Sequence, residues 1–188
     1  IKKTLFFLPN LLTFGNAFFG FCSLVFAMHG SLVVAAHCIL IGALLDVLDG
    51  RMARMLKVSS EIGVQLDSLS DMVSFCIAPA FLMYVWQIKQ FGLIGILICA
   101  AFALAGLMRL ARFNLIHEQQ TMFFLGLPTT IAGCFLVSVL LLFSGLENIP
   151  LFGIGISIMM LLLAWLMVST VSFPAFKQKL FKLKVQKI

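Results

Sequence analysis

The stretch from Asp46 to Asp71 reads DVLDGRMARMLKVSSEIGVQLDSLSD, and it holds all four aspartates of the chain: Asp46, Asp49, Asp67 and Asp71. The first pair is spaced by three residues and the second by four, so on helices each pair lies on one face. The connection between the two pairs is short, which makes the two helices antiparallel neighbours. We therefore expect the two acidic faces to converge.

The rest of the chain is far more apolar than a soluble domain. It has 188 residues, of which 62% are hydrophobic and 11% are charged, and its mean hydropathy is +1.15. A helix needs ~20 apolar residues to cross a membrane, and the ~10-residue alternating pattern of barrel strands does not occur here. We expect an all-α polytopic membrane protein, one domain over residues 1–188, with six transmembrane helices near 8–28, 31–49, 62–86, 91–114, 127–145 and 151–173.

The basic residues predict the orientation in the membrane. Of the 13 Lys and Arg residues, only Lys89 falls on the side opposite to the others. Because basic loops are retained in the cytoplasm, both termini and the acidic faces are expected on the cytoplasmic side of the cell (inner) membrane. The basic tail, residues 174–188, suits contact with anionic lipid headgroups or simply reinforces this topology. The net charge of +6 needs no nucleic-acid partner.

Four converging carboxylates at membrane depth require positive charge nearby. A single charged side chain at the bilayer centre costs at least ~2.5 kcal/mol, and the aspartates would also repel one another. Arg51, Arg54 and Lys57 could offset part of this charge. Hard oxygen ligands on two facing helices are typical of Mg²⁺ or Mn²⁺ sites, and two such ions ~4 Å apart would bind and polarise a phosphoryl group.

Small and basic residues stand among the aspartates at fixed positions. The full pattern is Asp46, two residues, Asp49, Gly50, two residues, Ala53, Arg54, eight residues, Gly63, three residues, Asp67, three residues, Asp71. Gly50 and Gly63 would let a ligand approach the acidic faces, although a helix C-cap and a packing contact are the alternatives. At every defined position the pattern resembles the signature of the CDP-alcohol phosphotransferase family (class I), whose members join a CDP-activated group to an alcohol and release CMP.

The resemblance implies a role for each residue of the signature. Asp46, Asp49 and Asp67 would be ligands of two metal ions, and Asp71 would be both a metal ligand and the general base. The residues expected to border the CDP moiety are Asp49, Gly50, Ala53, Arg54 and Gly63. The resemblance also implies a homodimer.

Three further segments resemble the bacterial-type phosphatidylserine synthases within this family: residues 8–16 with Gly20, residues 109–114 and residues 124–128. The reaction they imply transfers the phosphatidyl group from CDP-diacylglycerol to the hydroxyl of L-serine. Arg109 and Arg112, three apart on one helical face, and the nearby Asn114 could then receive a carboxylate or a lipid phosphate, or the arginines could reach only the headgroups. Asn10 and Thr13 could hydrogen-bond the cytosine or the diphosphate, or cap the start of the first helix.

Two other functions remain open from the sequence. Within the family, synthesis of phosphatidylglycerophosphate or a phosphatidylinositol phosphate would use the same signature, but its phosphorylated acceptor would call for further basic residues in the site. Intramembrane aspartates also occur in cation and proton transporters. The absence of a visible internal repeat and the position of the aspartates near one membrane surface argue against transport.

Overall fold

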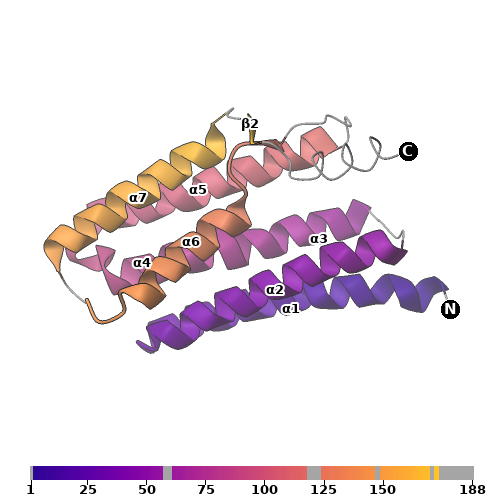
Figure 1. The fold of residues 1–188 in the computed structure, drawn as a ribbon, viewed down its shortest axis with the longest axis horizontal. Coiled ribbons are helices and arrows are strands. Elements are labelled where there is room, and N and C mark those ends of the chain that lie inside the picture. The colour runs from indigo at the N-terminus through magenta and orange to yellow at the C-terminus, as the bar shows by residue number, and fades with distance from the viewer. Residues whose placement is uncertain (1, 57–60, 118–123, 147–148, 170–171, 174–188) are drawn as a thin grey trace, which may run out of the picture.

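The described part of the chain is a bundle of helices that run up and down along one long axis (Figure 1). The computed structural model describes residues 2–56, 61–117, 124–146, 149–169 and 172–173. In chain order its elements are α1 (Lys2–Met28), α2 (Leu32–Leu56), α3 (Glu61–Asp71), the π-helix η1 (Met72–Ile77), α4 (Ala78–Trp86), the 3₁₀-helix η2 (Ile88–Phe91), α5 (Gly92–His117), β1 (Phe124–Leu125), α6 (Thr129–Leu142), α7 (Pro150–Val168) and β2 (Ser172–Phe173).

The expected all-α membrane fold is confirmed. Five segments are long and apolar enough to cross a membrane: residues 10–28, 32–52, 62–86, 88–115 and 150–168. The sixth apolar helix, α6, has only 14 residues, so the expected number of six spans is approximate. Large apolar side chains such as Phe18, Leu93 and Leu151 are exposed on the outside of the bundle, as expected for surfaces that face lipid.

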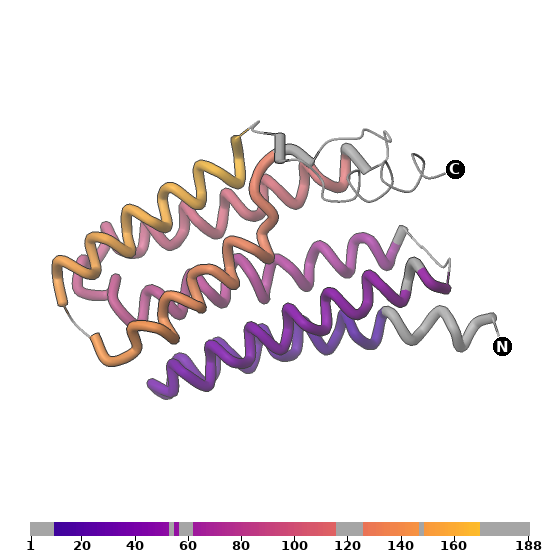
Figure 2. Tube along the Cα trace, in the orientation of Figure 1, coloured from indigo at the N-terminus to yellow at the C-terminus, as the bar shows by residue number. Residues whose placement is uncertain are grey.

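Neighbouring helices are antiparallel, which brings distant parts of the chain to one end. α1 and α2 lie side by side along most of their length, and α3 packs next to them (Figures 1 and 2). The start of α1, the end of α2, the start of α3 and the end of α5 all point to the right in Figure 1, where they extend beyond α6 and α7. This is the end that we expected to face the cytoplasm.

Two predicted helix ends are wrong, because α1 and α2 extend into the polar residues that flank their apolar segments. α2 runs on to Leu56, so Asp49 and Gly50 lie inside it and Gly50 is not a C-cap. α1 begins at Lys2, so Thr13 is not a helix-start cap. The same holds for Asn10. The residues after Gly50 are good helix formers, and a helix that leaves the apolar layer can carry charge without being interrupted.

A π-helix interrupts the third span directly after Asp71. Its three buried residues are Ser74, Phe75 and Cys76. Each of them faces a glycine of a different helix: Gly20 of α1 lies against Ser74, Gly133 of α6 against Phe75 and Gly106 of α5 against Cys76. The absence of side chains at these glycines lets three helices approach the π-helix closely.

A short antiparallel β-pair connects the segment before α6 to the segment after α7. β1 and β2 pair antiparallel, with Phe124 opposite Phe173. Gly126 follows β1 with a φ of +84°, and a Cβ added there would lie 2.9 Å from the guanidinium of Arg112. A larger residue would therefore be disfavoured at position 126 both by its backbone conformation and by the space available.

Replacement of Gly133 by alanine tests the packing around the π-helix. An added Cβ would lie 2.7 Å from the carbonyl oxygen of Phe75 and 3.0 Å from its Cα, and these backbone atoms cannot rotate away. We expect Gly133→Ala to destabilise the protein by about 1–3 kcal/mol, seen as a thermal midpoint in detergent that is lower by several degrees. The matched control is Gly155→Ala on α7, where an added Cβ has no atom within 4 Å. Equal midpoints for the two variants would contradict the packing described here.

Candidate active site

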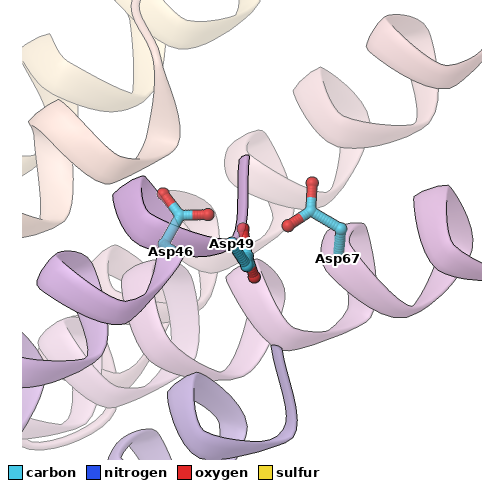
Figure 3. Close-up of side chains that lie close together, drawn as sticks. All are labelled: Asp46, Asp49 and Asp67. Atoms are coloured by element: carbon cyan, nitrogen blue, oxygen red, sulfur yellow. The ribbon is translucent and has the colours of Figure 1, made fainter. Parts of the chain in front are cut away.

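Three of the four aspartates form one cluster between α2 and α3. Asp46 and Asp49 are one helical turn apart on α2, and Asp67 faces them from the second turn of α3. One carboxylate oxygen from each residue lies within 4.8 Å of the others. Figure 3 shows Asp46 and Asp67 pointing toward each other with Asp49 between them. Asp49 is buried, and the other two are half-buried.

Asp71 lies one turn beyond Asp67, next to this cluster and deeper in the span. It is buried and is the last residue before the π-helix. Its carboxyl interacts with that of Asp46 and, electrostatically, with Arg109 of α5. The side chain of Asn16 on α1 also reaches it, with Nδ2 donating to Oδ1 at 3.4 Å. Asp71 is thus contacted from α1 and α2, and the charge of Arg109 on α5 acts on it from further away.

α1 supplies a hydroxyl to the cluster. Thr13 is buried, and its Oγ1 donates to Oδ2 of Asp49 at 2.8 Å. The backbone of Thr13 is held in turn by Ser70 of α3, whose Oγ donates to the Thr13 carbonyl at 2.8 Å. Asn10, one turn earlier on α1, is half-buried. The predicted contact of Asn10 and Thr13 with CDP stays a prediction, and Thr13 has a contact with an aspartate that the sequence did not suggest.

The two arginines predicted to act together diverge. The half-buried Arg109 turns inward: its guanidinium lies 5.4 Å from the ring centroid of Phe113 and Nη1 donates to Oγ1 of Thr129 at 3.5 Å, and its charge acts on Asp71. Arg112 turns to the end of α7. It donates to three backbone carbonyls, of Val168 at 2.9 Å and of Met167 and Ser169 at 3.3 Å each.

Asn114 joins α5 to α3. It accepts a hydrogen bond from Ser68 Oγ at 2.9 Å and donates to Gln65 Oε1 at 3.3 Å. Because Ser68 directly follows Asp67, this bridge fixes the part of α3 that contributes Asp67 to the aspartate cluster. The role of Asn114 and Arg112 toward an acceptor or a lipid phosphate stays a prediction.

Comparison with known proteins identifies the family. Residues 6–174 match the family described as CDP-alcohol phosphatidyltransferase. The chain belongs to the CDP-alcohol phosphatidyltransferase family. The match extends from α1 beyond α7, so the family resemblance is not confined to the aspartate signature.

Several similar members of the family carry more specific names. A protein of Helicobacter pylori named CDP-diacylglycerol–serine O-phosphatidyltransferase is 35% identical over 186 residues, which cover 96% of this chain and 77% of the relative. One of Bacillus subtilis with the same name is 34% identical, with 92% of both chains covered. An archaetidylserine synthase of Methanothermobacter thermautotrophicus is 34% identical over 89% of this chain and 69% of its own length.

The donor set of this CDP-alcohol phosphatidyltransferase fits a divalent cation. Three carboxylates from two helices converge in an otherwise apolar bundle, where their mutual repulsion and their removal from water are unfavourable without a positive charge. Hard cations that prefer oxygen ligands are the ions that such a set binds. Asp46, Asp49 and Asp67 could therefore hold a metal ion, with Asp71 beside them.

The remaining residues of the family signature are placed less completely. Gly50 on α2 and Gly63 on α3 are partly buried. Ala53 and Arg54 belong to the last turns of α2, but their side chains lie outside the described residues. Asn16 is a site residue for which the sequence pattern predicts no role. Its position in the sequence does indicate a polar contact, because an amide inside an apolar span is unfavourable without a partner.

Replacement of Asp67 by asparagine tests whether the three aspartates bind a metal ion. The loss of one of three carboxylates should weaken Mn²⁺ binding by about tenfold or more, measured by titration of the detergent-purified protein with Mn²⁺. Because the amide keeps the shape of the side chain, the thermal midpoint without metal should not fall. Glu147→Gln, which also removes a carboxylate, is the control, and an Asp67→Asn variant that binds Mn²⁺ like this control would contradict the assignment.

Proposed function

We propose that this enzyme transfers the phosphatidyl group of CDP-diacylglycerol to the hydroxyl of L-serine, giving phosphatidylserine and CMP. The observation that carries the proposal is the cluster of Asp46, Asp49 and Asp67 with Asp71 adjoining it. The relatives named after this reaction, at 34–35% identity over 92–96% of the chain, support serine as the acceptor.

The chemistry is a direct displacement at phosphorus. The serine hydroxyl oxygen bonds to the phosphorus that carries diacylglycerol, the bond from that phosphorus to the bridging oxygen breaks, and CMP leaves with the bridging oxygen. Mg²⁺ or Mn²⁺ ions held by Asp46, Asp49 and Asp67 would neutralise the diphosphate and make CMP a better leaving group. Asp71 takes the proton of the attacking hydroxyl.

Other residues of the site bind and orient the substrates. Arg109 is the arginine whose charge acts on Asp71, so it is the candidate for holding the carboxylate of serine near the base. Asn10, Gly50 and Gly63 would border the CDP moiety, together with Ala53 and Arg54. Arg112 and Asn114 would then act mainly by holding α7 and α3 in place around the acceptor.

The site is proposed to face the cytoplasm, and the chain is proposed to form a homodimer. The aspartates belong to the same half of the bundle as the basic residues of α2 and α5, so the cytoplasmic face of the cell (inner) membrane is the side from which a water-soluble amino acid and CMP would exchange. CDP-diacylglycerol would enter from the surrounding lipid. A homodimer of this chain is part of the proposal on the basis of the family resemblance.

Offering different acceptors in parallel tests the reaction. Detergent-purified protein with CDP-diacylglycerol and Mn²⁺ or Mg²⁺ should release CMP with L-serine, and not with glycerol 3-phosphate or an inositol phosphate. Removal of the metal by a chelator should abolish release, because the diphosphate charge is then not offset.

The acceptor results separate the competing functions. Release with glycerol 3-phosphate or an inositol phosphate alone would contradict serine as the acceptor and leave the aspartate roles intact. A protein that released no CMP with any acceptor and metal would overturn the enzymatic proposal and bring back cation or proton transport.

Replacement of Asp71 by asparagine tests the base. The amide keeps the shape of the side chain but cannot accept the proton, so we expect kcat to fall by about 10²-fold or more. The elution volume in gel filtration should not change. Ser138→Ala on α6, which removes an exposed hydroxyl bound to the Cys134 carbonyl, should keep full activity. Full turnover by Asp71→Asn would exclude Asp71 as the base.

A further inference from the structure

Asn16 on α1 is a buried amide that contacts the site through one atom only. Its side chain has 0% exposure, and its Nδ2 donates to Oδ1 of Asp71. Within the described part of the chain its Oδ1 has no hydrogen-bond partner. Gly42 of α2 lies against this oxygen, and a Cβ added to Gly42 would be 2.8 Å from it. The amide oxygen is therefore enclosed and unpaired.

A contribution to the stability of the fold does not explain why an asparagine stands at position 16. A buried polar atom without a partner is unfavourable, and an apolar side chain of similar size would avoid that loss in a helix surrounded by apolar neighbours. The contact that the amide does make is with the buried carboxyl of Asp71. A group that lowers stability and touches a reactive carboxyl is expected to serve the reaction.

The backbone around Asn16 is fixed to the helix that carries Asp71. Ser74 of the π-helix donates through Oγ to the carbonyl of Asn16 at 2.9 Å. One turn earlier on both helices, Ser70 donates to the carbonyl of Thr13. These two bonds lie on either side of Asp71 in the sequence, so α1 is held in register with the carboxyl that Asn16 contacts. The amide is thereby presented to Asp71 from a rigid position.

We propose that Asn16 is a positioning residue that fixes the side-chain orientation of Asp71 for attack by the acceptor hydroxyl. The inference rests on the proposed function, in which Asp71 takes the proton of that hydroxyl. Asn16 binds Oδ1 and so prevents rotation of the carboxyl away from the acceptor. Because Asn16 is itself enclosed, it acts on the rate of the chemical step and not on substrate binding.

The first test is Asn16→Leu, which keeps the branched shape of the side chain and removes the amide. We expect kcat for CMP release to fall by about 10–100-fold, with the KM values for serine and CDP-diacylglycerol changed by less than about twofold. The control is Ser23→Ala, which changes another buried polar residue of α1, two turns further from the aspartates. It should keep the wild-type kcat. A rise in KM with constant kcat would overturn the positioning role.

A double-mutant cycle with Asp71→Glu separates positioning from a structural effect. The glutamate already displaces the carboxyl, so Asn16→Leu should lower kcat by less than about threefold in that background. Equal factors in the two backgrounds would overturn the proposal, because a packing defect would act independently of residue 71. Asn16→Ala is measured in the same cycle, so that an effect of the larger leucine on folding is recognised.

Measurements on the wild-type enzyme distinguish a failure of the proposed function from a failure of the positioning role of Asn16. The cycle uses whichever acceptor the wild type accepts, so a different acceptor leaves the test of Asn16 unchanged. An active wild type with an equally active Asn16→Leu variant overturns the positioning role alone. A wild type without CMP release under any condition overturns the proposed function, and the role of Asn16 with it.

Discussion

The structure depends on holding four carboxylates inside an apolar helical bundle. Their removal from water and their mutual repulsion both oppose this arrangement, so the surrounding helices bring polar groups to them. Thr13 and Asn16 of α1 donate hydrogen bonds to them, and the positive charge of Arg109 on α5 acts on Asp71. The negative charge that these groups leave uncompensated is what divalent cations would neutralise. Binding should therefore also stabilise the fold, since ligands that bind only the folded state shift the unfolding equilibrium.

The π-helix after Asp71 links the site to the packing of the bundle. One additional residue in a helix rotates everything beyond it by about 100°, because an α-helix has 3.6 residues per turn. The third span can thus direct Asp67 and Asp71 to the site and still present Leu82 and Met83 to the apolar core. Glycines on α1, α5 and α6 make room for the wider turn. Changes in this packing should therefore affect the position of the aspartates as well as stability.

Arg109 and Arg112 lie three residues apart on one face of α5, but they make different contacts. The charge of Arg109 acts on Asp71, while Arg112 donates hydrogen bonds to the carbonyls at the end of α7, where unpaired acceptors and the helix dipole favour a cation. The β1–β2 pair and the closely packed Gly126 also lie at this end of α7. This end of α7 is thereby tied to α5 and to the start of α6.

The sequence by itself determined the fold class, the family and the convergence of Asp46, Asp49 and Asp67, because hydropathy, helical spacing and a short connection are local properties of the chain. The ends of the helices were predicted less well, since tertiary contacts extend helices through polar residues such as those after Gly50. Only the tertiary structure decided that Asn16 touches Asp71, that Thr13 touches Asp49 and that Arg112 caps α7. Those contacts join residues 36 to 56 positions apart, and their partners depend on how the helices rotate and approach one another.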